Sequence, residues 1–224
     1  MTDISFDNKH NVLTDEFEGV NCIAILGGTF NPVHNGHMMM AESALHQIDE
    51  IEKVVFMPNN LPAYKEQRDI ASNSHRLNML RLALSERSDM VVSDLELTRG
   101  GVTYTIDTLE QIKSVYSTIK IYFIIGDDSL VSFHQWHRYE QILSKCTLLV
   151  ATRSETFDSM RQYSKQLIEK LGYGEIIILR NDIVNISSSN IREQLSQQNM
   201  PEGVMPEGVE DYIKIYGLYG WENT

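Results

Sequence analysis

Apolar runs of strand length alternate with segments of helical period along most of this chain. Strands are expected at residues 22–26, 53–57, 90–97, 121–126, 147–152 and 175–180, and most of these runs are continuously apolar. That pattern is typical of strands covered by helices on both faces. Helices are expected at residues 36–47, 74–85, 105–116, 139–143 and 158–170, and two more follow the last strand at 188–196 and 209–216. The repeated β-α-β order predicts an α/β fold with a doubly wound parallel sheet and a small C-terminal helical part.

The alternation begins only after a polar stretch at residues 1–19. This stretch lacks the basic start and apolar core of a signal peptide, and we interpret it as a flexible leader. A single domain is expected over residues 20–224, because no linker or repeat of solenoid length divides them. In doubly wound sheets, ligands bind beyond the carboxyl ends of the strands, so the loops that follow the strands are where chemistry is expected.

Composition excludes several classes of protein. The chain has 224 residues, of which 42% are hydrophobic, and it is too apolar to be intrinsically disordered. Its 19 Lys and Arg against 31 Asp and Glu give a net charge of −12, whereas a general nucleic-acid binder would carry a basic surface. No run approaches the ~18 apolar residues of a membrane span. The two cysteines, Cys22 and Cys146, lie in apolar runs without metal-ligand spacing, which indicates a reducing, cytoplasmic location.

The first predicted strand runs directly into the string GGTFNPVHNGH, residues 27–37. Gly27 and Gly28 would let the backbone approach a ligand closely, and the start of the next helix offers free N–H groups to an anion. His34 and His37 are three residues apart and would share one face of that helix. Two imidazoles there could donate hydrogen bonds to phosphate oxygens. A Gly-Gly pair or a histidine in isolation is more often part of a turn or a helix cap. The interpretation as a phosphate site therefore depends on the whole string.

Taken whole, that string resembles the signature of the nucleotidyltransferase superfamily that carries an H-x-G-H motif. It is most similar to the Gly-Gly-Thr-Phe-Asp/Asn-Pro-x-His form of the bacterial nicotinate-nucleotide adenylyltransferases. The resemblance implies a Rossmann-like nucleotidyltransferase fold with ATP contacts from Gly27, Gly28, Thr29, Phe30, His34 and His37. Asn31 replaces the commoner Asp and keeps its turn-forming hydrogen bonds without the charge, so it is given no acid or base role.

Further segments resemble the same family. In MPNNLPAYKE, residues 57–66, Lys65 would offer a positive charge to the phosphate of the mononucleotide, although Ala63 and Tyr64 depart from the family's Pro-His pair. The helix SHRLNMLRLAL, residues 74–84, also matches, and its histidine and arginine are interpreted as mostly structural. In ELTRGGVTYTIDTL, residues 96–109, the resemblance implies that Tyr104 and Thr105 touch the nicotinate end of the substrate.

Two later segments complete the resemblance. In IIGDDSLVSFHQWHRYEQIL, residues 124–143, Gly126 ends a strand and Asp128 would bind ribose hydroxyls. In the same segment, Trp136 would stack on the pyridine ring and the amide of His137 would hold its carboxylate. In ISSSNIREQL, residues 186–195, the serines are typical of a helix N-cap, and the arginine one turn later would grip the β and γ phosphates of ATP. The residues implied there are Ser187, Ser188, Ser189 and Arg192.

The implied reaction is adenylyl transfer from ATP to nicotinate mononucleotide, a step of NAD biosynthesis that gives deamido-NAD and pyrophosphate. His34, His37 and Arg192 would be the catalytic residues. Mg²⁺ would be a cofactor carried by the phosphates of ATP, with no protein metal site. The expected partners are these small molecules, without nucleic acid or membrane, and a homo-oligomer is left open. The alternatives are nicotinamide mononucleotide as the preferred substrate, another adenylyltransferase of the superfamily such as a phosphopantetheine adenylyltransferase, and a non-catalytic ATP sensor.

Overall fold

A six-stranded, entirely parallel sheet forms the centre of the computed structural model, which describes residues 17–62, 70–152, 154–180 and 186–222. The strand order is β4-β2-β1-β6-β7-β8. These strands are β1 (Cys22–Gly28), β2 (Lys53–Pro58), β4 (Met90–Val92), β6 (Lys120–Gly126), β7 (Thr147–Thr152) and β8 (Ile176–Arg180). The predicted doubly wound α/β fold is confirmed, and the strand positions agree with five of the six expected runs to within a few residues.

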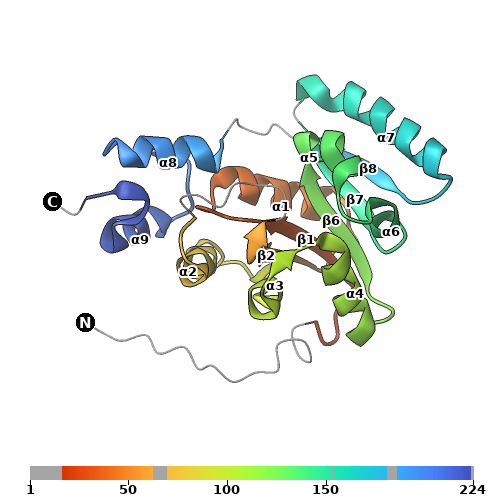
Figure 1. Ribbon diagram of the computed structural model, residues 1–224, viewed down its shortest axis with the longest axis horizontal. Helices are drawn as coiled ribbons and strands as arrows, with labels where there is room; N and C mark the ends of the chain where they lie inside the picture. Colours follow the sequence, from red (N-terminus) through yellow and green to blue (C-terminus); the bar gives the residue numbers. More distant parts are fainter. Residues whose placement is uncertain (1–16, 63–69, 153, 181–185, 223–224) are drawn as a thin grey trace.

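Helices cover both faces of the sheet (Figure 1). Alternate residues of each strand point to opposite faces, so Ala24 of β1 packs in one core and Ile25 in the other. The first face is covered by α1 (Asn35–Gln47), α2 (Asn73–Ala83), α8 (Ser188–Ser196) and α9 (Val209–Tyr216). The second is covered by α3 (Leu95–Arg99), α4 (Thr105–Val115), α5 (Asp127–Ser132), α6 (Tyr139–Leu143) and α7 (Phe157–Leu171). After β8 the chain returns to the first face, where α8 and α9 form the predicted C-terminal helical part.

Local capping explains where two helices of the first face begin. The Ser72 hydroxyl accepts a hydrogen bond from the backbone N–H of His75 at 3.3 Å, at the start of α2. The Ser187 hydroxyl likewise accepts from the N–H of Asn190 at 3.2 Å, at the start of α8. Such caps satisfy a backbone donor that the helix itself leaves unpaired. The expectation that the serine triplet caps a helix is therefore confirmed.

The strand predicted over residues 90–97 is wrong in its second half. β4 ends at Val92, and the chain turns into the short helix α3 from Leu95 to Arg99. The buried Ser93 hydroxyl accepts a hydrogen bond from the N–H of Leu95 at 3.3 Å, which bends the backbone away from the sheet. Serine side chains compete in this way with strand pairing, and the apolar spacing alone did not reveal it.

A second, two-stranded parallel ladder was not predicted. It joins β3 (Leu61–Pro62) to β5 (Val102–Thr103), with Leu61 opposite Val102. This ladder places the loop after β2 beside the start of α4. Two loops that are about forty residues apart in the sequence thereby form one wall beyond the carboxyl edge of the main sheet.

The end of the predicted leader lies within the described residues. Phe17 is fully buried, and its ring meets that of Tyr116 edge to face at 5.7 Å between centroids. The N–H of Phe17 also lies 3.4 Å from the Tyr116 hydroxyl oxygen.

The described residues also form the 3-10 turns η1 (Phe133–Gln135), η2 (Ser154–Thr156) and η3 (Leu218–Gly220). Within the described ranges, none of the helices combines the length and apolar character needed to span a bilayer.

Candidate active site

A cleft of about 690 Å³ opens at the carboxyl ends of β1 and β6. These neighbouring strands mark the switch point of the sheet, since the chain builds outward to β2 and β4 on one side and to β7 and β8 on the other. Most of the predicted site residues line this cleft. They are Gly27, Gly28, Thr29, Phe30, His37, Tyr104, Thr105, Gly126, Asp128, Trp136, His137, Ser188, Ser189 and Arg192.

The remaining predicted site residues are His34, Ser187 and Lys65. His34 and Ser187 are described but do not line the cleft, and Lys65 lies outside the described residues. Sequence reasoning did not single out several other lining residues: Met40, Asn59, Ile70, Glu96, Thr103, Phe123, Asp127, Ser129 and Ser132. The sequence offered a signal for three of these residues. Asn59 and Asp127 directly follow strands, where ligand-binding residues are expected, and Glu96 is an acidic residue within a largely apolar run.

The two glycines that end β1 are required by close packing. A Cβ atom on Gly27 would lie 3.1 Å from the ring of Phe123, and one on Gly28 would lie 3.1 Å from the ring of Phe30. Phe30 itself has a φ of 49°, a left-handed conformation that is uncommon for a bulky residue. Its ring is buried and meets His37 edge to face at 4.9 Å between centroids. This strained turn fixes the loop against the start of α1.

The two histidines of the motif take different positions. Their rings stack at 3.7 Å between centroids, with His37 on the cleft wall and His34 buried beside it. Burial lowers the pKa of His34 to about 4, so this imidazole is neutral at physiological pH. Within the described residues, Nδ1 of His34 is buried and has no hydrogen-bond partner. A Cβ atom on Gly36 would lie 3.0 Å from that nitrogen, which explains the glycine between the histidines.

A backbone contact sets the tautomer of His37. The N–H of His34 donates to Nδ1 of His37 at 3.2 Å, so Nδ1 is an acceptor. The neutral imidazole of His37 must then carry its proton on Nε2. His37 therefore presents an N–H donor from a ring whose orientation is fixed by the start of its own helix.

Arg76 ties three loops together beside the cleft. Its side chain is fully buried, and its guanidinium donates to the carbonyl oxygens of Thr29 and Asn59 at 2.8 Å and of Ala71 at 3.2 Å. A fourth bond reaches Oδ1 of Asn73 at 2.6 Å. No carboxylate pairs with Arg76 in the described part of the chain, so backbone dipoles compensate its charge. The interpretation of Arg76 as a structural residue fits this arrangement.

Asn31 connects the glycine loop, residues 27–34, to the C-terminal helical part. Its Oδ1 accepts hydrogen bonds from the N–H of Ala71 and from the Tyr219 hydroxyl, both at 2.9 Å. Its carbonyl oxygen accepts from Nη1 of Arg192, also at 2.9 Å. These contacts use Asn31 purely as an acceptor, a task that aspartate can perform equally well. They bring α8 and the turn η3 onto the loop that follows β1.

The start of α8 supplies the cleft with a cation and hydroxyl groups. Ser188 Oγ donates to the Pro32 carbonyl at 3.0 Å, and Nη2 of Arg192 lies 3.4 Å from Ser189 Oγ. Ser187 is used as the N-cap and therefore lies outside the lining. The free N–H groups of this helix start, together with Arg192, give this wall a positive potential suited to phosphate groups.

Aromatic side chains build the opposite wall. The rings of Tyr104 and His137 lie 4.6 Å apart, at the start of α4 and after η1. Trp136 is half-buried and packs on Phe133 at 5.4 Å and on Phe123 at 6.3 Å, measured between ring centroids. These contacts hold the indole in place while leaving part of it on the cleft wall. A planar aromatic ligand could stack there.

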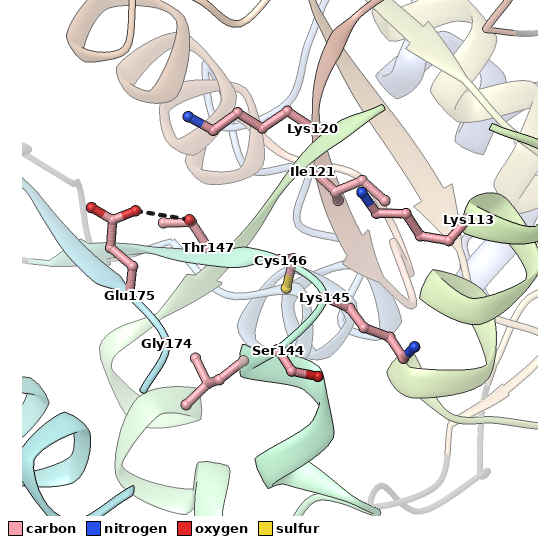
Figure 2. Close-up of a pocket in the computed structure, with 10 residues that line it drawn as sticks. Lys113, Lys120, Ile121, Ser144, Lys145, Cys146, Thr147, Gly174 and Glu175 are labelled. Carbon is pink, nitrogen blue, oxygen red and sulfur yellow. Dashed lines mark hydrogen bonds between the residues drawn. The ribbon is translucent and has the colours of Figure 1, made fainter. Parts of the chain in front are cut away.

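A smaller hollow of about 290 Å³ lies at the opposite edge of the sheet, beside the first residues of β6 and β7 (Figure 2). Its lysines, Lys113, Lys120 and Lys145, point in different directions, and each ammonium group already contacts a backbone or carboxylate oxygen. Burial raises the pKa of the Cys146 thiol to about 12, so it is a poor nucleophile. Convergent polar groups are therefore found in the cleft at the carboxyl edge and not here.

Comparison with known proteins places this arrangement in a family. A family model described as cytidylyltransferase-like matches residues 25–194. A probable nicotinate-nucleotide adenylyltransferase of Lachnoclostridium phytofermentans is 36% identical over 198 residues, which cover 88% of this chain and 98% of that protein. One from Borreliella burgdorferi, with the same description, is 37% identical over 197 residues, covering 88% and 96%.

Solved structures show the same fold. A nicotinic acid mononucleotide adenylyltransferase of Plasmodium falciparum, complexed with NaAD, has a TM-score of 0.74 at 20% identity. The match covers 91% of this chain and all of that one. A putative nicotinate-nucleotide adenylyltransferase of Vibrio parahaemolyticus has a TM-score of 0.64 at 21% identity, covering 89% and 96%. At these identities the similarity confirms the Rossmann-like nucleotidyltransferase fold.

Proposed function

This chain belongs to the family of nicotinate-nucleotide adenylyltransferases, and we propose on that premise that it transfers the adenylyl group of ATP to nicotinate mononucleotide. The observation that carries the proposal is the meeting of two distant motifs at one cleft. The H-x-G-H loop after β1 and the serine helix with Arg192 are more than 150 residues apart, yet Arg192 bonds directly to Asn31 of that loop. Both supply groups that suit a triphosphate.

In this proposal, ATP lies along the wall formed by the glycine loop and α8. The N–H of His37 Nε2 would contact the α phosphate, and Arg192 with the start of α8 would hold the β and γ phosphates. Asp128, at the start of α5, would accept hydrogen bonds from ribose hydroxyls. His34 is assigned an indirect part: its neutral ring stacks on His37 and keeps it in place, and it would not itself carry charge to the phosphates.

The mononucleotide would occupy the aromatic wall. Trp136 would stack on the pyridine ring, while the start of α4 at Tyr104 and Thr105 and the amide of His137 would bind its carboxylate. Lys65 remains the proposed contact for the phosphate of this substrate, although its side chain lies outside the described residues. The two substrates would meet between His37 and this wall, within one continuous cleft.

The chemistry would be a single phosphoryl displacement. A phosphate oxygen of nicotinate mononucleotide attacks the α phosphorus of ATP, the bond from that phosphorus to the bridging oxygen of the β phosphate breaks, and pyrophosphate leaves. The attacking oxygen is already anionic at neutral pH, so no strong base is needed. Catalysis would rest on alignment and on donors that stabilise the charge of the transition state.

Mg²⁺ would reach the site on the triphosphate of ATP. Within the described residues there is no group of three His, Cys, Asp or Glu side chains that could hold a metal ion. Mg²⁺ commonly binds through substrate phosphates, water and one or two carboxylates, and Asp127 and Asp128 both line the cleft. A cytoplasmic location is also proposed, in keeping with the buried free thiols of Cys22 and Cys146.

A two-substrate assay tests this function. The full chain is expected to release pyrophosphate from ATP and Mg²⁺ with nicotinate mononucleotide and to do so with a higher kcat/KM than with nicotinamide mononucleotide. A higher kcat/KM for the amide would support the alternative substrate. Pyrophosphate release from ATP with phosphopantetheine, but with neither mononucleotide, would indicate another adenylyltransferase, and ATP binding without any product would indicate a sensor.

A variant of Tyr219 tests whether the C-terminal helical part positions the wall of the cleft along which ATP is proposed to lie. Tyr219→Phe removes one of two donors to Asn31 Oδ1, and a hydrogen bond of this kind contributes about 1 kcal/mol. We expect the KM for ATP to rise roughly fivefold, with a small decrease in Tm. Tyr216→Phe, an exposed change on α9, serves as the control. Equal KM values in the two variants would show that Tyr219 does not position this loop.

A further inference from the structure

Glu96 is a buried carboxyl group in the wall of the cleft, and the proposed mechanism does not use it. It lies on α3, is only 5% exposed, and lines the cleft together with Tyr104 and Thr105. Within the described residues its carboxyl group makes one hydrogen bond, from the Thr108 hydroxyl to Oε1 at 2.6 Å. Most buried carboxylates are paired with a cation or bonded several times, so this arrangement requires an explanation.

The surroundings of Glu96 favour its neutral form. The one cation acting on it among the described residues is Arg99, whose Nη2 donates instead to the Thr108 hydroxyl oxygen at 3.0 Å. Strand β2 presents apolar side chains to α3, among them Met57. Burial is the dominant effect and raises the pKa of Glu96 to about 7, against the smaller opposing effects of Thr108 and Arg99. A carboxyl group held neutral is a hydrogen-bond donor, whereas an ionised one only accepts.

Glu96 also lies at the end of the cleft where the pyridine substituent is proposed to bind. The Thr108 hydroxyl, which bonds to Glu96, also lies 3.5 Å from the carbonyl oxygen of Tyr104 at the start of α4. An ionised carboxylate at this place would repel a pyridine carboxylate, while a neutral amide would not feel that repulsion.

We propose that Glu96 determines substrate specificity: its neutral carboxyl group accommodates the anionic carboxylate of the pyridine ring, and its ionised form discriminates against that substrate but not against the neutral amide. This inference rests on the proposed function. The preference for the acid should therefore be strongest below about pH 7 and should decline as Glu96 ionises. The residue would add a pH-dependent element to a site whose other contacts to the carboxylate are N–H groups.

The test is the pH dependence of KM for both mononucleotides at saturating ATP, from about pH 5.5 to 9. Titration of ATP or of the phosphate that both mononucleotides share affects both substrates alike. The ratio of the KM for the acid to that for the amide therefore isolates the pyridine end. In the wild type we expect this ratio to rise about tenfold per pH unit above pH 7. Glu96→Gln, which stays neutral and can still accept from Thr108, should make the ratio flat.

Two further variants separate this role from a structural one. Thr108→Val removes the hydrogen bond that favours ionisation, so the rise in the ratio should begin about 0.5 pH unit or more higher. Glu86→Gln, an exposed change outside the cleft, should follow the wild type. A ratio that is flat in the wild type, or that rises equally in Glu96→Gln, would overturn the proposal. Absence of pyrophosphate release from the wild type with both mononucleotides would overturn the proposed function itself, and this inference with it.

Discussion

Replacing His37 with alanine should lower kcat by about 10²-fold or more, with a small decrease in Tm from the lost hydrogen bond to its ring. The N–H on Nε2 is a preorganised donor on the cleft wall, and loss of one such donor to a developing negative charge costs about that factor. Its orientation is fixed in advance by the hydrogen bond from the His34 N–H and by the stacked His34 ring. The measurement is pyrophosphate release at saturating ATP and nicotinate mononucleotide.

A second variant at the same position separates chemistry from folding. His37→Asn keeps an acceptor near Nδ1 for the His34 N–H but has no donor in the place of Nε2. It should match the loss of turnover in His37→Ala while keeping the Tm of the wild type. His46→Ala, the same change at an exposed position of α1, is the control and should keep normal turnover. Turnover within about threefold of the wild type in His37→Asn would exclude the role given to this donor.

Replacing Arg76 with alanine should destabilise the protein by about 3–5 kcal/mol. The change leaves a cavity and removes the donor from carbonyl oxygens of three loops, and each buried acceptor left unsatisfied costs about 1–3 kcal/mol. The loss of a buried charge offsets part of that cost. Because Thr29 belongs to the glycine loop, the KM for ATP should rise as well. Urea unfolding gives the first quantity and steady-state kinetics the second.

The matched control for this prediction lies on the same helix. Arg81→Ala, at an exposed position of α2, should cost about 1 kcal/mol or less. Arg76→Lys should recover only part of the stability, because one ammonium group cannot reproduce a fork that serves several carbonyl groups. Similar unfolding free energies for Arg76→Ala and Arg81→Ala would show that the three loops hold their positions without this guanidinium.

The sequence predicted the fold because its signals are local and strong. Continuous apolar runs such as that of β6 can only be buried on both faces, and the order of runs and helical periods leaves few topologies for a parallel sheet. The prediction of a strand over residues 90–97 failed in its second half, because a hydrogen bond to one serine hydroxyl turns the backbone away from the sheet. Ser93 bonds to the N–H of Leu95, and apolar spacing carries no information about that bond.

The sequence also identified the motif residues of the site, but it did not distinguish their positions. His34 and His37 look equivalent as members of one motif, yet only His37 reaches the cleft wall. The difference arises because the ring of His34 turns into the core beside Gly36, where burial keeps it neutral. Ser187 and Ser188 differ in the same way, since the first is used as the cap of α8.

The sequence by itself therefore determined the α/β architecture and the two motifs suited to phosphates, since both depend on residue types at fixed spacing. The tertiary structure decided which side chains line one cleft and which protonation state each of them has there. The network from Tyr219 through Asn31 to Arg192 and the buried carboxyl of Glu96 depend on contacts between segments distant in the sequence. Such contacts, and the burial that shifts a pKa, exist only after the chain has packed, because desolvation depends on every neighbour at once.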